Sequence, residues 1–204
     1  MLERLVQRDW FYWFAVNTFR AWARLFLGLT VQGADNVPQT GGAVIACNHF
    51  SALDPPVVGV SVPREIHFMA KRELFGKPAL RLLMLGLRAF PVNRSGSDTS
   101  AIRAALRKLR AGLAVGIFIQ GTRSAGTNPA LDGAAFLALR SGAALVPTAV
   151  WREGRRFVVR FGEPLGPAAE GTSPGQVTAG LTRAINGLLP PGQRMGAAPS
   201  QDAG

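Results

Sequence analysis

The sequence contains little of what metal centres and disulfide frameworks require: one cysteine, Cys47, and two histidines, His49 and His67. A single cysteine excludes an intrachain disulfide and a cysteine-based zinc cluster, and two histidines exclude metal sites that need several. The glycines do not follow a dinucleotide-binding or P-loop pattern, because Gly76-Lys77 lacks the earlier glycine of a phosphate-cradling loop. We therefore expect a protein with no bound metal and no cofactor.

Acidic residues are scarce: 12 stand against 23 lysines and arginines, which gives a net charge of +11. This surplus favours an anionic partner, namely phosphate groups, a lipid surface, nucleic acid or an acidic carrier protein, although biased codon usage would explain part of it. Outside the N-terminus no basic cluster is interleaved with aromatic residues, and no helix-turn-helix or zinc signature occurs. We therefore expect no nucleic-acid partner.

One apolar stretch, residues 10–29, is about as long as a bilayer-spanning helix. Its eight strongly apolar residues favour insertion by about 0.3–0.6 kcal/mol each, whereas Arg20 near the centre costs about 2.5–3.5 kcal/mol. On a helix Asn17, Arg20 and Arg24 form one stripe opposite an aromatic face. We predict that residues 1–29 form an interfacial helix in the headgroup layer. The alternatives are a helix packed on this protein's own core and a signal peptide, which Arg20 disfavours.

From about residue 30 the chain alternates short apolar runs with amphipathic stretches, which is the pattern of an α/β fold. We predict a single domain over residues 30–189 and a disordered Pro/Gly-rich tail over residues 190–204. A mixed, mostly parallel sheet of about seven strands is flanked by helices. The predicted strands are Leu29–Gln32, Ala43–Asn48, Glu65–Met69, Arg88–Val92, Ala114–Ile119, Ala144–Val150 and Phe157–Phe161. The predicted helices are Leu53–Val60, Pro78–Leu85, Asp98–Arg110, Asp132–Arg140 and Gln176–Leu188.

The segment AVIACNHFSALDPP, residues 43–56, combines a buried strand with a polar turn that contains Asn48, His49, Ser51 and Asp54. His49 and Asp54 lie about 140° apart on a regular helix, so they can meet only if the chain bends between a strand and a helix. If they meet, the carboxylate sets the imidazole tautomer and the other ring nitrogen becomes a general base for a hydroxyl. The alternative is that Asp54 merely caps a helix and His49 is solvated.

Three further segments follow apolar runs: GLRAFPVNR (86–94), IFIQGTRS (117–124) and ALVPTAV (144–150). Backbone amides and guanidinium groups at strand ends suit phosphate binding. Together with NHFSALD these segments form four ordered blocks, and in them the sequence resembles the glycerolipid acyltransferases typified by 1-acylglycerol-3-phosphate O-acyltransferase. The resemblance covers about residues 30–165 and rests on NHFSALD for NHxxxxD, AFPVNR for the second block, FIQGTRS for FPEGTRS and LVPTAV for a V-P-V-type block.

The resemblance implies transfer of a fatty acyl group from a thioester of coenzyme A or acyl carrier protein to a hydroxyl of 1-acylglycerol 3-phosphate or a related lysophospholipid. It implies that His49 is the base and that Asp54 orients it. With the predicted interfacial helix, we expect a peripheral or monotopic protein on the cytoplasmic face of the cell membrane. The substrate-binding residues carried over by position are Asn48, Arg94, Gln120, Gly121, Thr122 and Arg123.

The sequence departs from the family pattern in the third block, where Ile119-Gln120 replaces Pro-Glu. Gln120 keeps the length and carbonyl of glutamate but loses its charge, which leaves a weak or inactive anionic-lipid-binding protein as the alternative function. Residues 171–175 fit a G-x-S-x-G nucleophile elbow, but Pro174 has no N–H to offer an oxyanion hole. We predict a loop opening the last helix there. Cys47 is interpreted as a small buried hydrophobe.

Overall fold

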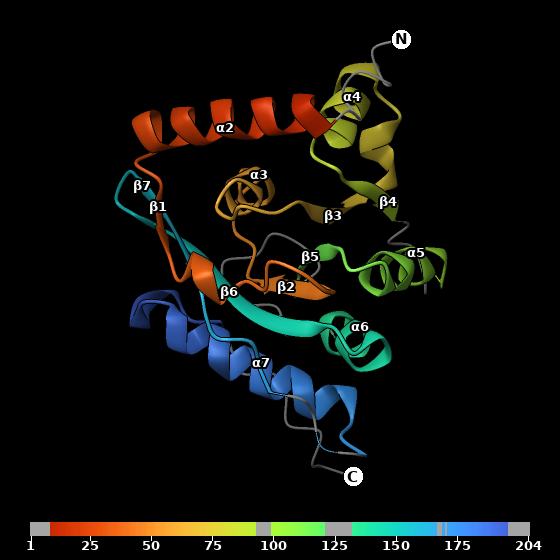
Figure 1. Cartoon of the computed structure of the whole chain (residues 1–204). Coiled ribbons are helices and arrows are strands. Elements are labelled where there is room, and N and C mark those ends of the chain that lie inside the picture. The colour runs from red at the N-terminus through yellow and green to blue at the C-terminus, as the bar shows by residue number, and fades with distance from the viewer. Residues whose placement is uncertain (1–8, 93–98, 121–131, 167–168, 170, 196–204) are drawn as a thin grey trace.

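The computed structural model describes residues 9–92, 99–120, 132–166, 169 and 171–195. Within them a seven-stranded sheet has the order β1-β7-β6-β2-β5-β3-β4. Helices cover both of its faces (Figure 1). The strands are β1 (Thr30–Gln32), β2 (Ala43–Cys47), β3 (Ile66–Lys71), β4 (Phe90–Val92), β5 (Ala114–Phe118), β6 (Ala144–Glu153) and β7 (Arg156–Phe161).

The direction of the strands confirms the predicted mixed, mostly parallel sheet. β6, β2, β5, β3 and β4 are parallel neighbours, whereas β7 is antiparallel to β6, and β1 is parallel to β7. All seven predicted strands are present. The largest difference is in β6, which runs three residues past the predicted end at Val150 because it forms a hairpin with β7 through a turn at Gly154.

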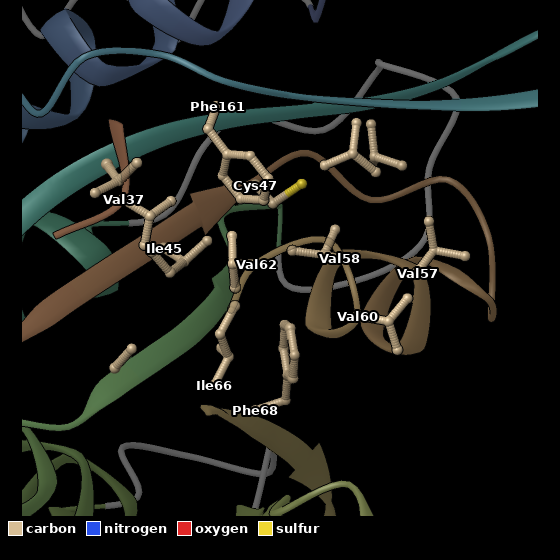
Figure 2. Close-up of a cluster of buried hydrophobic side chains, with 14 of the residues drawn as sticks. Val37, Ile45, Cys47, Val57, Val58, Val60, Val62, Ile66, Phe68 and Phe161 are labelled. Atoms are coloured by element: carbon tan, nitrogen blue, oxygen red, sulfur yellow. The ribbon is translucent and has the colours of Figure 1, made fainter. Parts of the chain in front are cut away.

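The helices form two layers. On one face α2 and α3 pack over the sheet, and on the other face lie α5, α6 and α7 (Figure 1). Figure 2 shows part of the core on the α3 side of the sheet, a cluster that includes Val57 and Val58 of α3 and Ile45 and Cys47 of β2. The helices are α2 (Asp9–Phe26), α3 (Asp54–Gly59), α4 (Pro78–Gly86), α5 (Thr99–Arg110), α6 (Gly133–Ser141) and α7 (Pro174–Leu188). Short 3-10 turns follow β1, β3 and α7: η1 (Ala34–Asn36), η2 (Arg72–Phe75) and η3 (Pro191–Gln193).

The orientation of α2 differs from the sequence prediction. Arg20, which we placed on an outward polar stripe, turns toward the protein and donates from Nε to the carbonyl of Val60 and from Nη2 to that of Val62, at 2.5 and 3.1 Å. Its charge therefore satisfies carbonyls beyond the end of α3 instead of meeting headgroups. On the aromatic face of this helix, opposite the predicted polar stripe, Tyr12 is buried in the core.

The outer face of α2 carries large apolar side chains beside the exposed polar residues Asn17, Thr18 and Arg24. Its exposed large side chains are Trp10, Phe14, Trp22, Leu25 and Phe26. In the described part of the chain, no helix has both the length and the apolar character needed to cross a membrane. One side of α2 packs on this protein's own core, as the alternative prediction for this segment expected, since Val16 and Ala23 are buried there with Tyr12. The interfacial role of the helix stays a prediction.

The first residues of the predicted disordered tail are ordered. After α7 the chain makes the turn η3, and Met195 is buried against the second core. The side chain of Asn186 accepts from the Met195 N–H at 2.8 Å and donates to its carbonyl at 3.0 Å. Residues 190–195 therefore differ from the predicted disordered tail, because a side chain on α7 pairs with their main chain.

Candidate active site

The predicted bend between strand and helix is present at the carboxyl end of β2. β2 ends at Cys47, and α3 begins at Asp54, followed by the two prolines of its first turn. Proline suits this position because the first N–H groups of a helix have no partner within the helix. The bend brings His49 Nδ1 to 2.7 Å from Asp54 Oδ2, and both side chains are buried. The pair that the motif predicted is therefore formed.

Asp54 organises the turn as well as the imidazole. Its Oδ2 also accepts from the N–H groups of Phe50 and Ser51, each at 2.8 Å. These two donors hold the carboxylate oxygen in place beside the ring. With Nδ1 donating to the carboxylate, Nε2 is the basic nitrogen of His49 and is the atom that can accept a proton from a substrate hydroxyl.

A row of aromatic rings supports the imidazole from β5 and β3. Phe118 stacks on His49 with ring centroids 4.2 Å apart, and Phe68 stacks on Phe118 at 5.8 Å. Gly116 makes room for this row, because a Cβ there would lie 2.3 Å from the Phe68 ring. Sequence reasoning missed both phenylalanines. The sequence did contain one signal for Phe118: residues two apart in a strand share a face, so Gly116 leaves space on the face that carries Phe118.

Asn48 and Gln120 hold the main chain around His49. The Asn48 side chain accepts from the Val150 N–H and donates to the Val150 carbonyl, both at 2.8 Å, and so extends the pairing of β2 with β6. The Gln120 Oε1 accepts from the His49 N–H at 3.1 Å. In the structure both residues hold the main chain of the site, and the prediction that they bind substrate stays a prediction.

The other four predicted substrate-binding residues, Arg94, Gly121, Thr122 and Arg123, lie outside the described residues. The described chain before them ends at Val92, the last residue of β4, and at Gln120, two residues after the end of β5. Because β2, β5, β3 and β4 are parallel, these ends lie at the same edge of the sheet as His49.

The competing nucleophiles and bases are not equipped for catalysis. Burial raises the pKa of the Cys47 thiol well above its usual range, and the negative charge of Asp54 adds to the effect, so the thiolate is disfavoured. Burial and the positive charge of Lys108 lower the pKa of His67 to about 4. Ser173 begins α7 as its N-cap and forms a capping box with Gln176, as the predicted loop before the last helix requires.

Comparison with known proteins shows the family of the chain. The sequence model of a family described as Acyltransferase matches residues 28–151. A 1-acyl-sn-glycerol-3-phosphate acyltransferase of Bacillus subtilis (strain 168) is 33% identical over 186 residues, which cover 86% of this chain and 93% of the relative. A protein of the same name from Borreliella burgdorferi is 27% identical over 134 residues, 64% of this chain and 54% of the relative.

The fold also matches a solved structure. The crystal structure of the 1-acyl-sn-glycerophosphate (LPA) acyltransferase PlsC from Thermotoga maritima superimposes with a TM-score of 0.67 over 85% of this chain and 77% of that chain. The sequence identity in this superposition is 23%, so the likeness concerns the fold.

Proposed function

Because this chain belongs to the acyltransferase family, we propose that it transfers a fatty acyl group from a thioester to the free hydroxyl of 1-acylglycerol 3-phosphate or a related lysophospholipid, giving phosphatidic acid from the former. It is an O-acyltransferase. The names of its relatives support the acceptor, and the thioester of coenzyme A or acyl carrier protein is the proposed donor. The observation that carries the mechanism is the buried contact of 2.7 Å between His49 and Asp54.

The reaction needs one base, because a thioester is already activated. His49 Nε2 takes the proton from the acceptor hydroxyl as its oxygen attacks the thioester carbonyl. Asp54 keeps Nδ1 protonated and stabilises the imidazolium that forms. The tetrahedral intermediate then collapses, the carbon–sulfur bond breaks, and the thiolate takes the proton from Nε2. The products are the ester and the free thiol, and His49 returns to its neutral form.

The acceptor is an anionic amphiphile, which suits a basic protein with an apolar outer helix. We propose that Arg94 and Arg123, with Gly121 and Thr122, bind its phosphate, since guanidinium groups and main-chain amides match a phosphate monoester. The exposed aromatic and aliphatic side chains of α2 would lie among lipid headgroups and tails, so that residues 1–29 deliver the domain to the membrane surface. The proposed location is the cytoplasmic face, where the thioester donors are available.

Substitution of His49 tests the mechanism. His49→Ala should lower kcat by about 10²–10⁴-fold, the usual contribution of a general base, with an unchanged fold. The measurement is transfer of a radiolabelled acyl group from coenzyme A and from acyl carrier protein to a panel of lysophospholipid and glycerol phosphate acceptors. His67→Gln is the matched control, because the ring of His67 contacts the Arg88 carbonyl and Lys108 and this variant should retain activity. Normal turnover by His49→Ala would refute the base assignment.

The glutamine at position 120 favours one other candidate, a lipid-binding protein of the same fold with little or no activity. In that case the wild-type protein would transfer no acyl group to any acceptor of the panel while still binding anionic vesicles. Under the acyltransferase proposal, the wild-type protein is active with at least one acceptor, and the His49 variant binds vesicles as well as the wild type does.

A further inference from the structure

Gln120 contacts the main chain of the turn that joins β2 to α3 and carries His49. β5 ends at Phe118, and the next N–H, that of Ile119, donates to the Cys47 carbonyl at 3.0 Å. One residue later the main-chain pairing of β5 with β2 is replaced by a side chain, since Gln120 Oε1 accepts from the His49 N–H. Gln120 is 4% exposed, so this contact is shielded from water. A buried N–H without an acceptor is unfavourable, and Gln120 supplies that acceptor.

The contact completes a set of three. The successive N–H groups of His49, Phe50 and Ser51 all donate to side chains, the first to Gln120 and the other two to Asp54. The turn is therefore held from β5 on one side and from α3 on the other. Asp54 and the Phe118 ring fix the imidazole itself, whereas Gln120 fixes the main chain that carries it.

We propose that Gln120 is a positioning residue of the transfer reaction, which holds the His49 main chain so that Nε2 stays at the place where the acceptor hydroxyl arrives. This inference rests on the proposed function, and it assigns Gln120 to the base instead of to the acceptor phosphate. A main-chain N–H needs an oxygen acceptor and no charge, and the amide of glutamine offers one at the same reach as the carboxylate of glutamate. The departure from the family pattern at this position therefore preserves the catalytic geometry.

Gln120→Met and Gln120→Glu separate the two roles. Methionine has a similar length but no oxygen, so the His49 N–H loses its acceptor and the turn can shift. Because a misplacement of about 1 Å costs about 10²-fold in rate, Gln120→Met should lower kcat by about that factor for every acceptor, with the KM for the acceptor unchanged. Gln120→Glu keeps an oxygen at this position, so its kcat should be close to that of the wild type. Gln39→Met, at an exposed glutamine away from the site, is the control.

A second readout does not depend on activity. The chain has two histidines, so protein labelled with [¹⁵N]histidine has two main-chain histidine amide signals, and the His67→Gln variant assigns them. In Gln120→Met the His49 amide signal should shift and its hydrogen should exchange faster with solvent, while the His67 signal stays in place. In Gln120→Glu the His49 amide should remain protected from exchange.

The result that overturns the proposal is a Gln120→Met protein with an unchanged His49 amide, or one in which the acceptor KM rises while kcat is retained. The second outcome would assign Gln120 to the acceptor. If the wild-type protein transfers no acyl group to any acceptor, the proposed function fails, and the positioning of His49 for transfer fails with it. The amide signals then still report whether Gln120 holds the turn, which keeps the two failures distinguishable.

Discussion

Replacing the exposed apolar side chains of α2 should release the protein from lipid vesicles. Phe14, Leu25 and Phe26 are 65%, 76% and 66% exposed, which together equals about two complete side chains. Complete burial of such a side chain contributes about 1.5–3 kcal/mol, so changing all three to serine should weaken membrane binding by about 3–6 kcal/mol. That loss corresponds to a dissociation constant about 10²–10⁴-fold higher.

The same exposure makes the substitutions safe for the fold. These three side chains lie outside both hydrophobic cores, and surface changes of this kind usually alter the free energy of unfolding by less than about 0.5 kcal/mol. The control is Leu139→Ser on α6, an exposed leucine on the opposite face of the sheet from α2. This variant should bind vesicles as the wild type does.

The assay is cosedimentation with vesicles of phosphatidylcholine and phosphatidylglycerol. Trp10 and Trp22 provide a second signal, because both are exposed on α2 and their fluorescence should shift to shorter wavelength when they enter the bilayer interface. If the triple serine variant sediments with vesicles as tightly as the wild type, α2 is not the membrane contact and the reasoning is refuted. Equal release by Leu139→Ser would show a nonspecific effect of removing apolar surface.

Two further predictions concern the turn and the second histidine. Asp54→Asn should lower kcat by about 10²–10⁴-fold and the free energy of unfolding by about 2–5 kcal/mol, because Oδ2 accepts three hydrogen bonds and an amide cannot replace its charge. Turnover measures the first effect and urea unfolding the second. A kcat within tenfold of the wild type would contradict the role of the carboxylate. For His67, burial and the charge of Lys108 lower its pKa from 6.5 to about 4, so between these values the unfolded chain binds a proton that the folded chain does not. The free energy of unfolding should therefore fall by up to about 3 kcal/mol as the pH drops from 6.5 to about 4. His67→Gln should remove this part of the loss. Identical pH profiles of unfolding for the wild type and the variant would disprove this role of His67.

Residues close in the sequence allowed the fold and the catalytic pair to be predicted. Each strand is a short apolar run between turn residues, so the local pattern of apolar residues was enough to predict all seven strands of the sheet. The His49–Asp54 pair was predictable for a similar reason, because the buried strand before it and the prolines after Asp54 restrict the chain to one kind of bend. Both inferences use residues within a few positions of one another.

Tertiary structure decided what depends on distant residues. The sequence of α2 indicated a polar stripe and an aromatic face but not which residues meet the sheet; the carbonyls of Val60 and Val62 decide this by accepting hydrogen bonds from Arg20. The partners of Asn48 and Gln120 lie 102 and 71 residues away along the chain. Hydrophobic periodicity records how deeply a residue is buried, whereas the partner of a polar side chain depends on which strands become neighbours, and that order is set by the whole sheet.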